Sequence, residues 1–328
     1  MSEFRTSLPA PLKSAVSIGH QDAILCMGSC FATHMGDWLQ NLKFSCLINP
    51  FGILYNPVSM GEGLSRLLTQ EPYTASDLVQ HGGLWHSFDH HGVFSYSNAN
   101  QALQGINKAL EDGFAFAQRA NRLILTPGTA LVYTRKESGR VAANCHKFPA
   151  ADFEKRRLGV GEVVGALSAP IAQWKASRPD LEILVSVSPV RHIRDGMVEN
   201  QRSKATLVLA LEALCRQFPF VHYFPAYELL LDDLRDYRFY ETDMIHPNEQ
   251  AIGYIRDYFA ASWFTEETLA LNRRISKISA AARHRPLHPD TAEHRIFIQQ
   301  QLGLIETLHQ EFPFLNLDQE KAIFRQYL

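Results

Sequence analysis

The chain has 328 residues, 46% of them hydrophobic, and a formal net charge of -2. This length predicts one large domain, or one domain with an appendage. The balanced charge argues against electrostatic capture of nucleic acid or of a membrane surface. Residues 1–17 contain no apolar core of signal-peptide length, and no later apolar run is long enough to span a bilayer, which predicts a soluble, cytoplasmic protein.

Five short apolar segments have the length and branched composition of buried strands. They are residues 23–28, 44–48, 122–126, 182–188 and 218–224. Helical patterns separate most of them, over residues 31–42, 152–176 and 203–217. This alternation predicts a three-layer α/β/α domain over residues 1–260, with a five-stranded, mostly parallel sheet. Ligands of such sheets bind at the carboxyl ends of the strands.

Two further regions complete the expected organisation. Residues 57–120 are rich in Gly, His and aromatic residues, which predicts an insertion of short hairpins and helices that walls a pocket. Residues 261–328 are mostly polar and helical in pattern, with a break at "RPLHPD", and predict a helical extension packed on the domain. His86, His90 and His91 in the insertion could ligate a metal, but a polar aromatic loop explains them better because Asp89 is the one carboxylate nearby.

The cysteines do not indicate a disulfide framework. The chain has five of them, an odd and sparse set. Cys26 and Cys30 are four positions apart, but no second pair has the spacing of zinc ligands. The sequence therefore predicts neither structural disulfides nor a zinc site.

The tripeptide Gly28-Ser29-Cys30 follows the first apolar segment and precedes a helical pattern. Glycine at the end of a buried strand permits a sharp turn into a helix, whose N-terminal N–H groups can stabilise an oxyanion. Ser29 is a candidate nucleophile if a histidine can act as its base, although a helix N-cap explains the same serine. Cys30 is a second candidate, although a small buried cysteine packs well as a hydrophobic residue.

A second candidate element is "ETDMIHPN", in which Asp243 and His246 are three positions apart. On a turn or helix start, that spacing places both side chains on one side. A carboxylate that holds the imidazole Nδ1–H leaves Nε2 free to accept a proton. A surface pair that caps the following helix is the alternative.

A glycine-serine turn after the first strand, combined with a late Asp-x-x-His-Pro, resembles the SGNH (GDSL-type) hydrolase superfamily. The letters "GSCFA" at residues 28–32 are the namesake motif of the GSCFA family, which resembles those hydrolases. Further stretches similar to that family are residues 49–57, 123–133, 144–149, 186–207 and 223–248. The resemblance implies a flavodoxin-like strand order and a serine-dependent esterase or acyl transferase that acts on an ester of a small molecule or carbohydrate, with no metal or organic cofactor.

The resemblance also implies roles for individual residues. Ser29 corresponds to the nucleophile, His246 to the general base and Asp243 to the carboxylate that orients it. Gly52 corresponds to the glycine whose backbone N–H joins the oxyanion hole, and the Ser29 N–H would be the second backbone donor.

Two departures from the SGNH pattern affect the expected chemistry. Met27-Gly28-Ser29 replaces the usual Gly-Asp-Ser, and Ala130 stands where an oxyanion-hole asparagine is usual. Losing one such donor removes about 2–4 kcal/mol of transition-state stabilisation. Side chains that could replace the asparagine are Asn144, Asn56, Thr126 and Thr129. One alternative is a catalytically weak or inactive protein of the same fold that serves as a ligand-binding or interaction module. The other is a transferase that depends on Cys30.

Residues that follow the later strands are candidates for substrate binding. Arg191 and His192 come after the fourth apolar segment, and Arg191 could bind an anionic group or pair with a nearby carboxylate. Asn144 and His146 lie in "NCHKFP" and could reach the same pocket. Asn200, Ser203 and Lys204 lie at a predicted helix start, where capping explains Asn200 or Ser203.

Overall fold

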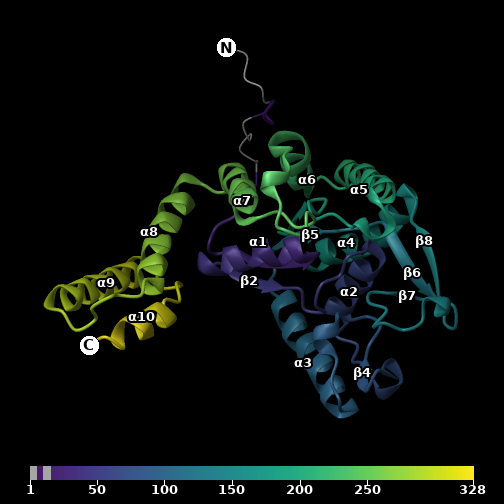
Figure 1. The fold of residues 1–328 in the computed structure, drawn as a ribbon, viewed down its shortest axis with the longest axis horizontal. Helices are drawn as coiled ribbons and strands as arrows, with labels where there is room; N and C mark the ends of the chain where they lie inside the picture. Colours follow the sequence, from purple (N-terminus) through teal and green to yellow (C-terminus); the bar gives the residue numbers. More distant parts are fainter. Residues whose placement is uncertain (1–5, 10–15) are drawn as a thin grey trace.

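The structure is a computed structural model that describes residues 6–9 and 16–328. Most of the N-terminal segment 1–17, whose composition argues against a signal peptide, lies outside the described residues. The central sheet consists of β1 (Ala23–Gly28), β2 (Ser45–Ile48), β5 (Arg122–Thr126), β9 (Glu182–Val185) and β10 (Val221–Tyr223). Its order is β10-β9-β5-β1-β2 and every pairing is parallel, which confirms the predicted five-stranded, flavodoxin-like sheet (Figure 1).

Side chains that alternate along β1 face two separate cores. Leu25 and Met27 pack toward four helices, α2 (Pro57–Thr69), α3 (Ala99–Ala117), α4 (Val160–Ser177) and α5 (Met197–Gln217). Ile24 and Cys26 pack toward α1 (Cys30–Asn41) and α7 (Glu249–Trp263). The sheet is therefore covered on both faces, as the apolar composition of its strands predicts.

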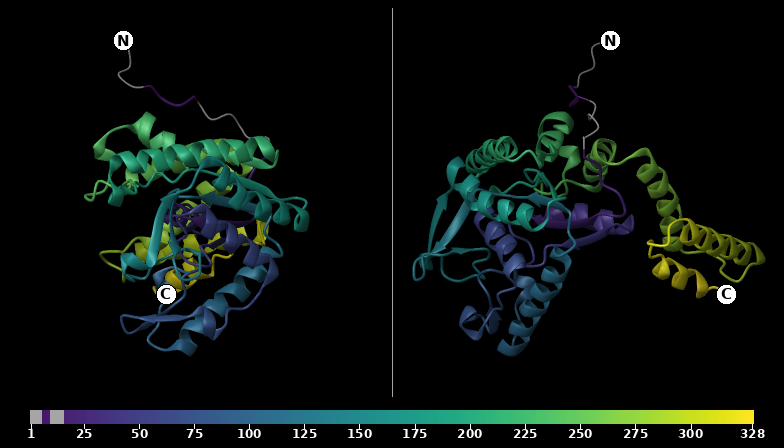
Figure 2. Two further views of the ribbon diagram at one scale, coloured as in Figure 1. Left: turned by 90° about the vertical axis from the view of Figure 1, so that its right-hand side faces the viewer. Right: turned by 180° about the vertical axis from the view of Figure 1, so that it is seen from behind.

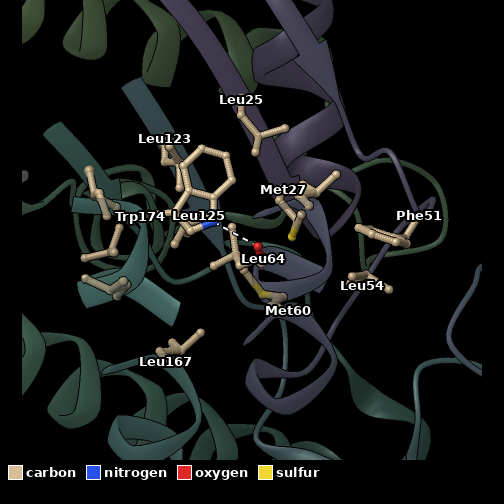
Figure 3. Close-up of a cluster of buried hydrophobic side chains, with 14 of the residues drawn as sticks. Leu25, Met27, Phe51, Leu54, Met60, Leu64, Leu123, Leu125, Leu167 and Trp174 are labelled. Carbon is tan, nitrogen blue, oxygen red and sulfur yellow. Dashed lines mark hydrogen bonds between the residues drawn. The ribbon is translucent and has the colours of Figure 1, made fainter. Parts of the chain in front are cut away.

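The first of these cores contains a fully buried tryptophan. The Trp174 side chain lies among leucines of β1, β5 and α2, and its Nε1–H donates to the Leu64 carbonyl at 2.9 Å (Figure 3). The hydrogen bond satisfies the indole donor, so the ring is buried without leaving an unpaired polar group. Gly61 lets α2 approach α4 closely, because a Cβ there would lie 2.2 Å from the Ala166 carbonyl oxygen.

Two small antiparallel sheets lie outside the central one. The first is a hairpin of β3 (Val79–His81) and β4 (Leu84–His86) inside the predicted insertion. The second has the order β7-β6-β8, formed by β6 (Leu131–Arg135), β7 (Val141–Ala142) and β8 (Phe153–Arg157). The helix predicted from residue 152 is wrong at its start, because residues 153–157 form β8 and α4 begins at Val160.

Helices make up the C-terminal region. After β10 the chain forms α6 (Ala226–Glu228), a π-helical turn (Leu229–Leu234) and then α7. Three further helices follow, α8 (Glu266–Arg283), α9 (Ala292–Glu311) and α10 (Asp318–Arg325), and they share a core of their own. In Figures 1 and 2 these three helices project from the side of the α/β domain, as a helical extension.

An ion pair links the extension to the domain. Lys43, just before β2, lies 2.7 Å from Glu320 of α10, and both side chains are largely buried. Ser279 of α8 donates to the same carboxylate at 3.1 Å. No helix in the described part of the chain is long and apolar enough to cross a membrane.

Candidate active site

Gly28 makes the turn that places Ser29 at the carboxyl end of β1. Its φ is +146°, and a Cβ at this position would lie 2.4 Å from the Thr126 carbonyl oxygen of β5. Only glycine can therefore follow this path without moving the neighbouring strand. The Gly28 N–H donates to the Asn49 side chain at 2.8 Å, and the Gly28 carbonyl accepts from Leu54 at 3.0 Å. The turn is thus held by two hydrogen bonds to the loop after β2 and lies closely against the end of β5.

Ser29 is the N-cap of α1, and its hydroxyl is enclosed. Its Oγ accepts from the Phe31 N–H at 3.2 Å and lies 3.5 Å from Thr126 Oγ1. The residue is 1% exposed. The capping interpretation is therefore correct, and it does not exclude chemistry, since a capping hydroxyl lies at the helix N-terminus where negative charge is favoured.

Asp243 and His246 form a pair on the loop between β10 and α7. His246 Nδ1 lies 2.7 Å from Asp243 Oδ2. Asp243 Oδ1 accepts the main-chain N–H groups of Ile245 and His246 at 2.8 and 3.0 Å. The ring hydrogen bond and these two main-chain donors lower the pKa of Asp243 to about 2. The carboxylate is thus ionised and oriented, and it fixes the imidazole with Nε2 available to take a proton.

The Asp243–His246 loop is tied to the loop that follows β9. The Arg191 N–H donates to the Ile245 carbonyl at 3.3 Å, and its guanidinium donates to the Met244 carbonyl at 3.2 Å. Within the described residues no hydrogen bond joins Ser29 Oγ to His246 Nε2. The structure therefore contains an Asp–His pair on the loop before α7 and, separately, a serine at the end of β1.

Both predicted backbone oxyanion donors already have acceptors. The Gly52 N–H donates to the Asn49 carbonyl at 2.7 Å, and the Ser29 N–H donates to the Thr126 carbonyl at 3.0 Å. Neither N–H is free in this conformation. Their oxyanion role stays a prediction that requires each of these bonds to open.

Three of the four side chains suggested as replacements for the missing asparagine are occupied or enclosed. Asn56 caps α2, with its amide bonded to Ser59 through both atoms. Thr129 Oγ1 lies 3.0 Å from Ser203 Oγ and accepts the Leu131 N–H. Thr126 contacts Ser29 Oγ itself at 3.5 Å. Asn144 differs, because its Oδ1 accepts the His146 N–H at 2.9 Å while its amide N–H groups have no partner among the described residues.

The predicted substrate-binding residues separate into two groups. Asn144, His146 and His192 line one cavity of about 530 Å³ between β6–β8 and the loop after β9. Arg191 does not line it; its guanidinium stacks on the rings of Tyr237 and Tyr240, at 5.0 and 4.1 Å. The structure thus gives Arg191 a role in holding the Asp243–His246 loop.

Two residues of α5 have roles that the sequence did not indicate. Asn200 Oδ1 accepts the His192 N–H at 2.8 Å, and Ser203 Oγ accepts the Ala130 N–H at 2.7 Å. The capping interpretation of both is therefore wrong, because α5 begins at Met197 and both residues lie inside it, where they hold the loops after β5 and β9. Their position inside the helix could have indicated these roles. Polar side chains of a helix that face a sheet are buried and need hydrogen-bond partners there.

Lys204 follows Ser203 in α5, and the sequence pattern indicates no particular role for it; the structure shows it 1% exposed. Its ammonium donates to the carbonyls of Ser188 and Val190 at 2.6 and 2.9 Å. Burial lowers its pKa to about 7. Lys204 therefore holds the loop after β9 by two hydrogen bonds. That loop in turn contacts the Asp243–His246 loop through Arg191.

The remaining sequence candidates have structural surroundings of their own. His86 is bonded to Ser95 Oγ and to the His81 carbonyl, and His91 caps a short helical turn. No group of three or more His, Cys, Asp or Glu side chains in residues 6–9 and 16–328 could hold a metal ion. Burial raises the pKa of the Cys30 thiol, which disfavours the thiolate that nucleophilic chemistry needs.

Comparison with protein-family models identifies the chain. The model of the GSCFA family matches residues 23–259, and that of the GSCFA domain protein, C-terminal domain, matches residues 275–328. No curated protein and no solved structure matches it. The first match includes the glycine turn, Ser29, Asp243 and His246, and it extends over more than half of the sequence. This chain therefore belongs to the GSCFA family.

Proposed function

We propose that the chain is a serine-dependent esterase or acyl transferase that acts on an ester of a small molecule or carbohydrate, with Ser29 as nucleophile. The observation that carries the proposal is the presence of two elements near the carboxyl ends of the parallel strands. One is a serine on a glycine turn at a helix N-terminus, and the other is the Asp243–His246 pair at 2.7 Å. The resemblance to SGNH hydrolases supplies the same roles.

The proposed reaction proceeds in two halves. His246 Nε2 takes the Ser29 hydroxyl proton while Oγ attacks the ester carbonyl, and Asp243 stabilises the imidazolium through Nδ1–H. The tetrahedral intermediate collapses, and the proton passes to the departing alcohol oxygen. Water or a second alcohol then gives its proton to His246 and attacks the acyl-serine, which releases the acid or a new ester and regenerates Ser29.

This reaction requires His246 to approach Ser29. The loop from Glu241 to Pro247 contains Met244 at a φ of +58°, a strained conformation for a residue other than glycine. Hydrogen bonds of catalytic residues are often long without substrate and shorten in the complex. We place the required movement in this loop, because its hydrogen bonds to Arg191 involve the main-chain carbonyls of Met244 and Ile245 and not the His246 side chain.

Tyr55 is our candidate for the missing oxyanion donor. A Cβ at Gly128 would lie 3.4 Å from both Ser29 Cβ and Tyr55 Cδ1, so the ring and the serine side chain both lie against Gly128. Its hydroxyl has no hydrogen-bond partner among the described residues. Burial raises the pKa of Tyr55, so the phenol keeps its proton and remains a donor. Tyr240 and Tyr227, by comparison, contact Arg191 and Gln201.

A fluorophosphonate probe tests the proposal, because it reacts covalently with activated serines. Wild type should be labelled, Ser29→Ala should not, and His246→Ala should react at least about 100-fold more slowly. Cys30→Ala is the matched control and should react like wild type. Labelling of Ser29→Ala, or none of wild type, would contradict the proposed function.

A second candidate function is a ligand-binding protein without catalysis. The specific observation in its favour is the enclosure of Ser29, which is 1% exposed, together with the occupied N–H groups of Ser29 and Gly52. Under this alternative the probe leaves wild type unlabelled while the cavity still binds small molecules. The two candidates thus differ in labelling and agree in binding.

A further inference from the structure

The 530 Å³ cavity lined by Asn144, His146 and His192 has a size typical of small-molecule sites. Its walls come from the loop after β2, from β6, from the connection between β7 and β8, and from the loop after β9. Tyr55 connects it to the candidate nucleophile, since Tyr55 lines the cavity and its ring also lies against Gly128, as the Ser29 side chain does. A ligand in the cavity would therefore contact Tyr55 and be separated from the enclosed Ser29 by this ring and Gly128.

The side chains that line the cavity are apolar on much of the wall and positively charged at two positions. Aromatic and aliphatic side chains such as Tyr133, Phe148 and Leu131 form much of the wall. Lys147 and Arg194 are exposed at the cavity, and no Asp or Glu lines it. Within the described part of the chain neither cation has an ion pair or a side-chain hydrogen bond. The cavity thus combines an apolar wall with two positive charges that lack a counter-ion.

The backbone that presents Lys147 is strained. His146 and Lys147 have φ values of +47° and +61°, two consecutive left-handed residues that are not glycine. The turn is held by the His146 N–H, which donates to Asn144 Oδ1 at 2.9 Å, and by its Nε2–H, which donates to the Ser87 carbonyl at 2.8 Å. Such strain persists where surrounding contacts enforce it, and it concentrates at functional sites.

The two histidines of the cavity add no charge at neutral pH. Burial lowers the pKa of His146 to about 4, and burial also lowers the pKa of His192. The positive charge of the lining therefore comes from Lys147 and Arg194. Arginine and lysine at the mouth of an apolar cavity select a ligand that carries an anionic group on an apolar body.

We propose that this cavity is the substrate site and that it selects esters with an apolar group and a carboxylate, the apolar group lying against Tyr133 and Phe148 and the carboxylate between Lys147 and Arg194. As a statement about substrate, the inference rests on the proposed function. As a statement about binding, it can be measured without catalysis. It gives Asn144 a place beside the ligand, where its unpaired amide can donate.

The test measures binding by calorimetry to the full chain carrying Ser29→Ala, with 4-phenylbutyrate and its neutral analogue 4-phenylbutyramide. The carboxylate should bind about ten-fold more tightly than the amide. Arg194→Ala and Lys147→Ala should each weaken the carboxylate about five-fold and leave the amide unchanged. Arg216→Ala is the control, because it removes an exposed arginine at the far end of α5 and should change neither affinity.

A steric variant tests the location. Ala143 lines the cavity, and Ala143→Phe should abolish binding of both ligands, whereas Ala143→Ser should bind them like the parent. Circular dichroism and thermal unfolding check that both variants fold. Equal affinity for carboxylate and amide, binding of neither, or full binding by a folded Ala143→Phe would overturn the inference. Selective binding without probe labelling of Ser29 would instead overturn the proposed function and leave the binding site standing.

Discussion

Gly28 determines where the candidate nucleophile lies, because its positive φ turns the chain away from β5 just before Ser29. The sequence predicts this turn, since glycine between an apolar strand and a helix has few other uses. The pairing of Asp243 with His246 is also predictable, because three positions on a turn bring the two side chains together. Tyr55 is not predictable, because its relation to Ser29 depends on the loop after β2 crossing the loop after β5.

Gly28→Ala should destabilise the protein by at least about 3 kcal/mol and remove any activity. The added Cβ would lie 2.4 Å from the Thr126 carbonyl oxygen, in a backbone conformation that alanine disfavours. Gly253→Ala in α7 is the matched control, because open space surrounds that position, and it should stabilise by about 0.5–1 kcal/mol. Urea unfolding measures both, and equal effects would refute this account of the turn.

Tyr55→Phe should lower kcat about 100-fold if the hydroxyl stabilises the oxyanion, because loss of one donor has this effect in acyl transfer. KM and thermal stability should change little, since the hydroxyl has no partner within the described residues. Tyr96→Phe in the insertion, a partly exposed tyrosine, is the control and should retain full kcat. Activity of Tyr55→Phe at the wild-type level would show that another group acts as the donor.

At the scale of elements, α5 holds in place the loops that surround the candidate site. Asn200, Ser203 and Lys204 lie on one face of this helix and bond the loops after β5 and β9. The sequence predicts the helix but not this role. A polar residue near a predicted helix start is interpreted as an N-cap as long as the exact first residue of the helix is unknown. The same difficulty explains β8, because "FEKRR" buries only Phe153 and its charges resemble a helical surface.

Lys204→Met should change how stability depends on pH. The folded pKa of about 7 lies below the ordinary value for lysine, so between pH 7 and 10 the unfolded state binds more protons than the folded state. Wild type should therefore gain stability as pH rises, by up to about 1.4 kcal/mol per pH unit relative to Lys204→Met. Urea unfolding at several pH values measures this, with the exposed Lys136→Met as control. Parallel curves for wild type and Lys204→Met would contradict the burial of a titrating ammonium.

At the scale of the whole molecule, the α/β sheet follows from sequence and the placement of the C-terminal helices does not. The composition of the strands predicts the three-layer arrangement, because a strand that is apolar on both faces must be covered by helices on each face of the sheet. The helical pattern after residue 260 predicts helices, but the contact with the domain depends on single pairs such as Lys43 and Glu320. These residues are 277 positions apart, and no local pattern marks them as partners.

Lys43→Met should destabilise the protein by about 3 kcal/mol, because it leaves the Glu320 carboxylate buried without its cation. Arg274→Met breaks the more exposed pair with Glu311 within the extension and should destabilise the protein far less than Lys43→Met. Thermal unfolding of both variants measures the contrast. If the two costs are equal, the Lys43–Glu320 pair contributes nothing special to the attachment of the extension.

The strand order also has a consequence in time. β1 pairs with β5, so Ser29 and Thr126, which are in contact, are 97 positions apart, and His246 follows still later. Ribosomes deliver the chain from its N-terminus, and contacts between distant segments form late. The serine is therefore synthesised early, but its proposed base His246 is available only when almost the entire α/β domain has emerged. A nascent or prematurely terminated chain that lacks residue 246 cannot carry the proposed chemistry.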